Sequence, residues 1–504
     1  MSFVKIGKHA VETRKYNVTM LLSSADVEAS SRIDTSGIDI VEYPGAFNRS
    51  ECLDIAARFS KMSPLEVTVL YLDVGVKSCR ALMEALPTMT ILEMPFEVLL
   101  GDMTWPCSSL AADVIDKGHN HNKQPLRRVL YQGNSAFDPA IEHFGVPSPA
   151  TEATQLMGTA HLFMDYIKPM SFPYRFANVI LREVARLAVN NLMLRPYDQI
   201  RRDLGLLPTS YIRSAHETPA LILFPMVWGV ESPRALPPNA QPIHPVLPEP
   251  PKPLIDGELA TFVSTKCDGK GIIPIVFGTQ ASLSMGQVDK ISQALTRLSD
   301  RFCILWHLPP RRMPRPDLQN LGEHILPIDQ WFPQNDVLGH PQTKVFLTHG
   351  GYGSLYEAAY HGVPIVAIPS FGDQDDNAVK AESGGWGIRL NKDSFSVEEL
   401  ENAIRKAASA TMQSRAEKIS SLVRHKSGME EAVYWIDYAR QYGVEHLMPF
   451  RAMQSSYLAY YNLDVALVLA GILWITTTSV YMLFVKKRPS QARQASTAKK
   501  EKAG

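Results

Sequence analysis

Short apolar segments alternate with amphipathic segments in the second half of the chain. Residues 271–277 (GIIPIVF) form a continuous apolar run, which predicts a buried strand, and the amphipathic segment 285–299 predicts a helix after it. Strand and helix continue to alternate with short connections, which is typical of a parallel sheet covered by helices on both faces. Further strands are predicted at residues 301–306, 344–348 and 364–368, and further helices at 354–360 and 377–382.

The first half shows the same alternation less clearly. The pattern predicts a helix at residues 5–15, strands at 17–22 and 97–100, and a helix at 175–195. A second α/β domain is therefore expected before residue 232. Residues 233–253 are rich in proline, which lacks a backbone N–H, so this segment predicts a stiff, extended linker between the two domains.

Residues 465–485 contain no charged side chain. At about 1.5 Å per residue a helix of this length crosses the ~30 Å hydrocarbon core of a bilayer, which predicts a transmembrane helix; a buried core helix is the alternative. The tail that follows is basic, which favours a cytoplasmic tail and a body on the other side of the membrane. Residues 1–16 contain no apolar signal segment, so either a leader is missing before Met1 or the helix inserts tail-first with a cytosolic body.

Composition narrows the class of partner. Lys and Arg together number 51, as do Asp and Glu, so no net charge points to nucleic acid. The five cysteines lie far apart without a C-x-x-C pair, which excludes a zinc-finger or thioredoxin motif and leaves the redox compartment open.

The segment most informative about chemistry begins where the predicted strand ends at Thr348. His349 and Gly351 belong to a glycine-rich turn, and a helix opens near Ser354. Backbone N–H groups in such a turn suit a diphosphate, and His349 can donate a hydrogen bond to a phosphate oxygen. Glu357, one turn into the helix, can accept hydrogen bonds from two ribose hydroxyls. The alternative is an ordinary glycine turn, which any doubly wound fold has between strand and helix.

Two neighbouring segments add groups that suit a nucleotide sugar. Asp373 and Gln374 follow the next strand, and a carboxylate beside an amide can both accept from and donate to sugar hydroxyls; a helix cap is the alternative. Upstream, Trp331 precedes Gln334 by three residues. The indole can stack on a base, although a lone Trp more often lies in the core.

Together these residues resemble the signature of the UDP-glycosyltransferase family, which includes the UDP-glucuronosyltransferases. The matching runs are WFPQNDVLGHP, FLTHGG, YEA, HGVP and DQ. The resemblance is strong over the second half and patchy over the first. It implies a GT-B fold with two Rossmann-like domains and an inverting transfer from a UDP-sugar to a hydroxyl of a small, lipophilic acceptor. It implies no metal and no other cofactor.

The resemblance also implies a role for each site residue. Trp331 would stack on uracil, Gln334 would bond to the uracil carbonyls and Glu357 would hold the ribose. Asp373 and Gln374 would hold the sugar. Gly353 stands where many members have Asn, so its backbone contact survives and a side-chain contact does not. The diphosphate would be held by Thr279, His349, Gly351, Gly353 and Ser354.

An inverting transfer requires a base for the acceptor hydroxyl. The family's pattern uses a His at the end of the first strand, oriented by a later Asp. The run FEVLLGD matches the second element and makes Asp102 the orienting Asp; a helix cap is the alternative. The His has no match, because its place would fall just before Met1. His9 lies in the middle of a predicted helix, and His119 and His121 lie in a polar loop, so none is a convincing replacement.

Two hypotheses therefore remain. Either this enzyme's chain lacks its leader, first strand and catalytic His, or the protein binds a UDP-sugar and is catalytically deficient. The first is favoured, because losing a central strand exposes two strand edges. The expected location is the endoplasmic reticulum membrane, with one span, a lumenal body and a cytoplasmic tail; a homo-oligomer is left open. The expected parts are an acceptor domain at 1–232, the linker 233–253, a UDP-sugar domain at 254–447, a juxtamembrane segment at 448–464, the membrane helix 465–485 and the tail 486–504.

Overall fold

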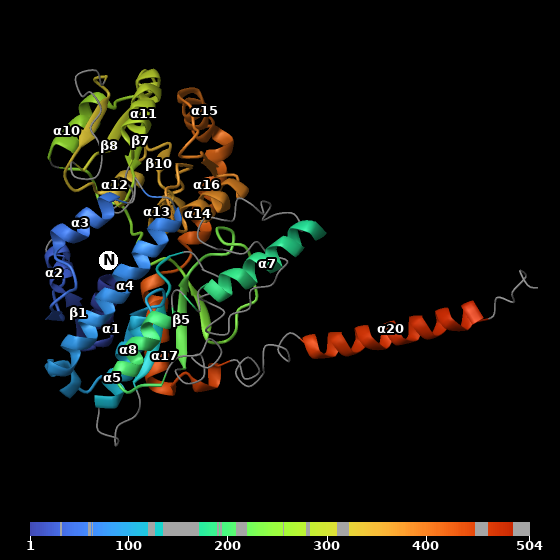
Figure 1. Ribbon diagram of the computed structural model, residues 1–504. Coiled ribbons are helices and arrows are strands. Elements are labelled where there is room, and N and C mark those ends of the chain that lie inside the picture. Colours follow the sequence, from blue (N-terminus) through green and yellow to red (C-terminus); the bar gives the residue numbers. More distant parts are fainter. Residues whose placement is uncertain are drawn as a thin grey trace, which may run out of the picture. The chain divides into compact units, whose positions relative to one another are not determined.

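The computed structural model describes most of the chain in two compact units, Met1–Met448 and Pro449–Gly504. Figure 1 colours the elements from the amino to the carboxyl terminus. The described residues are 1–30, 33–58, 62, 64–118, 126–134, 171–188, 191, 194–207, 219–255, 257–278, 283–309, 322–448 and 462–486.

The second half contains a six-stranded parallel sheet in the order β12-β11-β10-β7-β8-β9. Apolar side chains fill a separate core on each face, so helices cover both faces as the alternating pattern predicted. The strands are β7 (Gly271–Val276), β8 (Phe302–His307), β9 (Ile325–Ile328), β10 (Phe346–Thr348), β11 (Ile365–Ala367) and β12 (Gly387–Arg389). The helices are α10 (Gly257–Lys266), α11 (Met285–Leu298), α12 (Gln334–Leu338), α13 (Tyr352–His361), α14 (Gln374–Ser383), α15 (Val397–Ala407) and α16 (Ala410–Val423).

The first half contains two parallel sheets. Strands β1 (Val18–Ser23) and β2 (Ile38–Tyr43) form one, and the other has the order β3-β4-β5-β6. The latter strands are β3 (Val98–Asp102), β4 (Arg127–Tyr131), β5 (Ala220–Pro225) and β6 (Ala240–Ile243). The helices are α1 (Ser2–Arg14), α2 (Ser24–Ser30), α3 (Arg49–Arg58), α4 (Pro64–Ala85), α5 (Cys107–Gly118), α7 (Phe172–Ala188) and α8 (Arg195–Asp203), with 3-10 turns at Leu86–Thr88 and Thr90–Glu93. The one helix predicted at 175–195 therefore ends earlier, and α8 begins where it was expected to stop.

Strands β1 and β3 contribute to the same two cores although no backbone pairing joins them in the described residues. Leu21 and Leu99 pack against the cluster under α4 and α5, whereas Val18 and Val98 pack against the cluster under α1. One further strand between β1 and β3 would join the two sheets into one.

The segment predicted as a continuous linker, 233–253, contains a strand. Residues Ala240–Ile243 form β6 and pair in parallel with β5, with Phe224 opposite Pro242. These four residues are extended, as the proline content predicted, but they are paired in a sheet, and the division of the chain at this linker stays a prediction. The pairing is possible because β6 is an edge strand, where a proline deprives no neighbouring strand of a hydrogen bond on the outer side.

Two segments pack on the half of the body to which they do not belong by sequence. The helix α17 (Gly428–Tyr442) places Val433 and Ile436 in the core of the first half, with Leu221 of β5. In the opposite direction, Val227 and Val230, just after β5, lie in the core of the second half. A 3-10 turn at Glu445–Leu447 follows α17. Each half therefore contributes side chains to the core of the other half.

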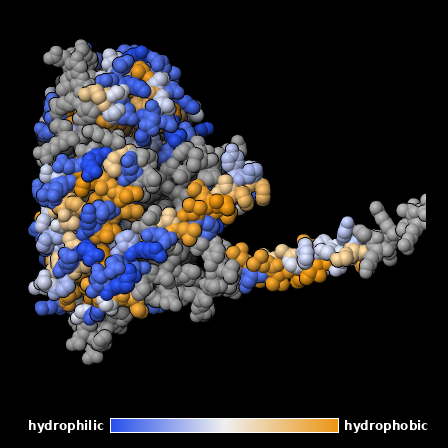
Figure 2. Space-filling model, viewed as in Figure 1, coloured by the Kyte–Doolittle hydropathy of each residue, from blue (hydrophilic) through white to orange (hydrophobic). Residues whose placement is uncertain are grey.

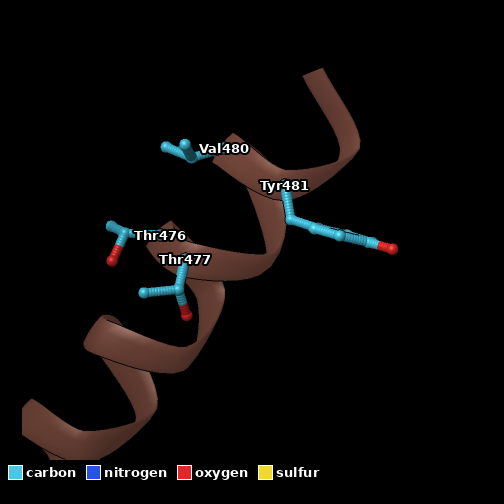
Figure 3. A pocket seen from close by; sticks show the side chains of 4 residues that line it. All are labelled: Thr476, Thr477, Val480 and Tyr481. Atoms are coloured by element: carbon cyan, nitrogen blue, oxygen red, sulfur yellow. The ribbon is translucent and has the colours of Figure 1, made fainter. Parts of the chain in front are cut away.

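The carboxyl-terminal unit contains α20 (Leu463–Lys486), which includes the predicted membrane segment. It is the one helix among the described residues that is long and apolar enough to cross a membrane, over Leu463–Leu483. Thr476 and Thr477 donate their hydroxyls to the carbonyls of Ile472 and Leu473 at 2.9 and 2.8 Å, which satisfies these polar groups inside an apolar helix. Figure 3 shows Thr476, Thr477, Val480 and Tyr481 projecting from this one helix around a shallow surface depression, which no other described element encloses.

Candidate active site

Three neighbouring strands of the second sheet end beside one another. Thr348 at the end of β10 pairs with Val276 of β7 on one side and with Ala367 of β11 on the other. Because the strands are parallel, the loops that follow them meet at one edge of the sheet. In open α/β sheets this edge is where ligands bind.

Glycines pack the turn after β10 tightly around His349. A Cβ atom at Gly278 would lie 2.6 Å from the imidazole, and one at Gly351 would lie 2.4 Å from its Nε2 atom. Gly350 has a φ of +82°, and a Cβ there would lie 2.9 Å from the carbonyl oxygen of Gln374. Only glycine fits these places, so the turn holds backbone and imidazole at one point. Gly351 is the N-cap of α13, and its first-turn amides receive no side-chain cap in this described segment.

The residues predicted to hold base and ribose come together. Gln334, the first residue of α12, donates from Nε2 to the Glu357 carboxylate at 2.6 Å and lies 3.4 Å from the Ser354 hydroxyl. Trp331 is 67% exposed, whereas its neighbour Phe332 is buried. The alternative that Trp331 is a core residue is therefore wrong, and its ring face is accessible.

The two residues predicted to hold the sugar follow β11. Asp373 is the N-cap residue of α14, yet its side chain makes no cap hydrogen bond; its carboxylate accepts from Asn377 Nδ2 at 3.2 Å. Asn377 also donates to the carbonyl of Gly350 at 3.0 Å, which ties this loop to the glycine turn. Gln374 accepts through Oε1 from the backbone N–H groups of Ser370 and of the next residue. The side-chain carbonyl of Gln374 therefore holds the loop between β11 and α14 in place.

Comparison with known proteins identifies this arrangement. The family model described as "UDP-glucoronosyl and UDP-glucosyl transferase" matches residues 12–495, which is nearly the whole chain. The chain belongs to this family. It is a UDP-glycosyltransferase in the sense that the family name gives, and the enzyme class predicted from the signature is confirmed.

Curated relatives support the same assignment. UDP-glucuronosyltransferase 2B33 of Macaca mulatta is 27% identical over 504 residues, which cover 94% of this chain and 87% of the relative. The 2-hydroxyacylsphingosine 1-beta-galactosyltransferase of Rattus norvegicus is 31% identical over 479 residues, which cover 91% of this chain and 81% of the relative. The UDP-glycosyltransferases that are similar in sequence therefore include transferases of different sugars.

Solved structures show the fold. Os79 from O. sativa in complex with UDP is similar with a TM-score of 0.60 at 15% identity, and the match covers 88% of this chain and 98% of Os79. The glycotransferase of kitacinnamycin is similar with a TM-score of 0.60 at 16% identity, over 86% of this chain and 94% of that chain. The predicted GT-B fold is thereby confirmed.

Of two further residues predicted to hold the diphosphate, the structure describes only one. Thr279 lies outside the described residues. Gly353 lies in the first turn of α13, where a Cβ atom would lie 3.1 Å from Cδ1 of Leu247. The Leu247 side chain thus occupies space that an Asn at this position would need. The backbone of Gly353 keeps the place that the resemblance assigned to it, and its contact with phosphate stays a prediction.

Asp102 ends strand β3 on the first half. Its carboxylate accepts from the backbone N–H of Thr104 at 2.8 Å and from the Thr104 hydroxyl at 2.6 Å. Burial raises the pKa of Asp102, and these two hydrogen bonds oppose that shift. Among the described histidines none is hydrogen-bonded to Asp102; His119 and His121 lie outside the described residues, and His9 lies within α1. The orienting role of Asp102 stays a prediction.

Two tyrosines connect Asp102 with its surroundings. The pKa of Tyr131 is raised to about 12, by burial first and by Asp102, and its side chain is hydrogen-bonded to Ser2 at the start of α1. Tyr71, on α4, has a pKa raised by desolvation and then by both Asp102 and Asp373. The amino end of α1 lies near Asp102, because Phe3 packs on Tyr131 at 5.6 Å between ring centroids and Tyr131 is the register partner of Asp102. Neither tyrosine stands in a motif, so sequence reasoning missed both.

One lysine of the first half acts electrostatically on Glu357, the residue predicted to hold the ribose. Lys5 on α1 donates to the carbonyl of Leu247 at 2.6 Å and pairs with Glu249 at 3.2 Å, and its charge lowers the pKa of Glu357. The net effect on Glu357 is nevertheless upward, to a pKa of about 7, because desolvation is the largest cause. Burial lowers the pKa of His349 to about 4, against the opposing effect of a hydrogen bond with the Val276 backbone, so His349 is neutral at physiological pH and has one N–H to donate.

Donor affinity is expected to rise with pH through the pKa of Glu357. Below pH 7 its carboxyl is protonated; above pH 7 it is the acceptor that ribose hydroxyls require, so binding releases a proton. We expect about tenfold tighter binding of a UDP-sugar at pH 8 than at pH 6, measured by calorimetry. A UDP-sugar is preferable to UDP, since the terminal phosphate of UDP titrates near pH ~6. Glu357→Gln should abolish the dependence; equal affinity at both pH values for the unmodified chain would contradict this role.

Proposed function

We propose that this UDP-glycosyltransferase transfers a sugar from a UDP-sugar to a hydroxyl of a small, lipophilic acceptor, with inversion at the anomeric carbon. Trp331 and Gln334 hold the base, Glu357 holds the ribose, and the turn from His349 to Ser354 holds the diphosphate. Asp373 and Gln374 hold the sugar. The proposal includes no metal, because amide and imidazole donors supply the diphosphate's hydrogen bonds.

The observation that carries the proposal is the Gln334–Glu357 hydrogen bond of 2.6 Å beside the glycine turn. Base and ribose contacts must lie one nucleoside length from the diphosphate contacts, and α13 carries Ser354 and Glu357 one turn apart on one helix. The charges of Asp102 and Asp373 both raise the pKa of Tyr71, which supports an acceptor site between the two halves. An acceptor hydroxyl there would lie between the orienting carboxylate and the sugar loop.

The acceptor and the sugar can be identified by product analysis. Membranes that contain the full chain would be incubated with a panel of UDP-sugars and lipophilic alcohols and phenols, and products detected by mass spectrometry. A product that requires both the chain and one UDP-sugar, and that is lost on Asp373→Ala, supports the proposal. Hydrolysis of the UDP-sugar without any transfer, or transfer unaffected by Asp373→Ala, would contradict the sugar assignment.

A second candidate function is UDP-sugar binding without efficient transfer. The observation that favours it is that Asp102 is held by Thr104 and by no histidine among the described residues. The two candidates share the donor site and differ only in turnover. A transfer assay on the chain with and without an added upstream histidine therefore separates them.

We further propose that the body lies in the lumen of the endoplasmic reticulum and that the basic tail is cytoplasmic. Two cysteine pairs support this: Cys79 with Cys107 and Cys267 with Cys303, at Cα–Cα distances of 5.5 and 5.2 Å. All four side chains are buried, one pair in each half, whereas Cys52 is an exposed free thiol. Buried disulfides are typical of oxidising compartments.

Protease protection and alkylation of intact microsomes are expected to show this topology together. Protease added outside should remove the tail and spare the body. After denaturation without reductant only Cys52 should react with an alkylating reagent, and all five cysteines should react after reduction. Asn48, exposed in an N-x-S sequon, should carry glycan. Digestion of the body with the tail spared, or five reactive thiols without reduction, would contradict a lumenal body.

A further inference from the structure

The proline-rich segment 247–252 contacts the short helix α12 of the candidate donor site. Its sequence is LPEPPK, and because proline has no backbone N–H, only Glu249 and Lys252 offer one after the first residue. Both N–H groups are used. Glu249 donates to Asn335 Oδ1 at 3.1 Å, and Lys252 donates to Asp336 Oδ1 at 2.9 Å. The segment is therefore fastened to the first turn of α12.

The helix α12 depends on such contacts for its position. It has only five residues, Gln334–Leu338, and no described side chain caps its amino end. A helix of this length is not stable by itself, so its neighbours must hold it in place. Its first residue, Gln334, donates to the Glu357 carboxylate at 2.6 Å. Whatever fixes α12 therefore also fixes the pair that is proposed to hold base and ribose.

Lys5 of α1 holds the same segment from the first half. Its ammonium group donates to the carbonyl of Leu247 at 2.6 Å and pairs with the Glu249 carboxylate at 3.2 Å. The Leu247 side chain in turn packs on α13, because a Cβ atom at Gly353 would lie 3.1 Å from its Cδ1 atom. One cation of the first half thus binds a segment that contacts both α12 and α13.

We propose that Lys5 is a positioning residue for the UDP-sugar, because it holds residues 247–252 against the two helices that carry Gln334 and Glu357. This role rests on the proposed function of those two residues. It assigns to the first half a direct part in donor binding, before any acceptor is present. The hydrogen bonds and the ion pair of Lys5 preorganise the site, so that less ordering is needed when the donor binds.

The positive charge of Lys5 gives this role an electrostatic signature. Glu357 faces charges from three elements, which are Lys5 on α1, Glu249 in the proline-rich segment and Asp336 on α12. Burial, Glu249 and Asp336 raise the pKa of Glu357, whereas the hydrogen bond from Gln334 and the charge of Lys5 lower it. Without Lys5 the carboxyl would keep its proton to higher pH, and it would accept hydrogen bonds from the ribose only there.

The test is calorimetric titration of the full chain with a UDP-sugar between pH 6 and pH 9. Because α20 exposes apolar side chains along its length (Figure 2), all proteins are kept in detergent. UDP-glucose, UDP-galactose and UDP-glucuronic acid are compared first, and the one that binds the unmodified chain most tightly is the probe. The variants are Lys5→Met and Lys5→Arg. The matched control is Lys8→Met on the same helix, since Lys8 also forms an ion pair, with Asp34, and is 25% exposed against 21% for Lys5.

Lys5→Met should weaken donor binding at pH 7 about three- to tenfold, and it should move the rise of affinity with pH to higher pH. Lys5→Arg keeps the charge and the hydrogen-bond donors, so the rise should stay where it is in the unmodified chain. Lys8→Met should bind as the unmodified chain does at every pH. When Glu357→Gln has removed the titrating carboxyl, adding Lys5→Met should leave the pH profile flat.

Two kinds of result would contradict the account, and they can be told apart. Unchanged affinity in Lys5→Met, or an affinity lowered equally at every pH, would overturn the positioning role. So would the same shift in Lys8→Met, or a shift in Lys5→Arg as large as in Lys5→Met. Failure of the unmodified chain to bind any of the three UDP-sugars would instead refute the donor site itself, and the role of Lys5 with it.

Discussion

The chain that begins at Met1 is expected to transfer sugar about 10²–10⁴-fold more slowly than the same chain extended upstream of α1 by a histidine-bearing strand. Tyr131 lies opposite Asp102 in the pairing of β3 with β4, and its ring lies 5.6 Å from that of Phe3, so the amino end of α1 lies beside the carboxyl end of β3. No backbone pairing joins β1 and β3 in the described residues, so each has an edge with which an added strand could pair. A histidine there would take the acceptor proton, and Asp102 would orient it and stabilise its charged form.

The comparison needs four proteins, which are the chain and its extended form, each with and without Asp102→Asn. In the extended form Asp102→Asn should remove most of the transfer, whereas in the original chain it should change little. UDP affinity, measured in parallel, should be alike in all four, because Asp102 does not touch the nucleotide in this mechanism. Rapid transfer by the original chain that is lost on His9→Ala would show that the base lies elsewhere.

Breaking the buried ion pair between Glu231 and Lys380 is expected to destabilise the body by about 3–5 kcal/mol. The two side chains are 3% and 1% exposed and 2.8 Å apart. Glu231 belongs to the segment after β5, and Lys380 lies on α14, which begins at Gln374. Lys380→Met leaves a carboxylate uncompensated in a core, which costs its full desolvation. The loss can be measured by chemical denaturation of the full chain in detergent.

Two further variants distinguish the loss of the ion pair from a general loss of stability. Glu231→Gln together with Lys380→Met removes both charges and should recover much of the lost stability. Lys392→Met breaks an exposed pair with Asp393 and should cost at most about 1 kcal/mol. If Lys380→Met were no more harmful than Lys392→Met, the ion pair would not hold the two halves together. Two tyrosines of α13 also form hydrogen bonds with this part of the chain. The Tyr352 hydroxyl donates to the carbonyl of Pro225 at 2.8 Å, and the Tyr356 hydroxyl accepts from the backbone N–H of Val227 at 3.1 Å.

The second half was predictable because its strands are continuous apolar runs. β7, β8, β10 and β11 lie in segments that the pattern marked, whereas β9 (ILPI) contains a proline and β12 (GIR) has a single large apolar residue, so neither stands out from its surroundings. The glycine turn was predictable for a local reason, since no other residue fits at Gly278, Gly350 and Gly351. The exposure of Trp331 was not predictable, because a single tryptophan forms no periodic pattern of apolar residues.

The remaining features depend on contacts between distant residues. The pattern of α17 showed an amphipathic helix but not that its apolar side covers β4 and β5 of the other half. The strand β6 was hidden by Pro242, which is tolerated only because the strand lies at an edge. Cysteine spacing gave no pairing: one pair joins α4 to α5, and the other joins Cys267, just after α10, to β8.

The central claim is that residues 331–374 bind the UDP part of a nucleotide sugar, and calorimetric titration of the full chain with UDP tests it most directly. The fragment 253–442 is unsuitable, because it would expose the apolar side of α17 and lack Val227 and Val230 in its core. His349→Ala should weaken binding by about 1–3 kcal/mol, since it removes a hydrogen bond to a charged phosphate. The control His324→Ala, on a histidine that bonds to the Lys266 carbonyl away from the turn, should bind as the original chain does. UDP binding that is absent from the folded chain, or unchanged by His349→Ala, would contradict the assignment of this site.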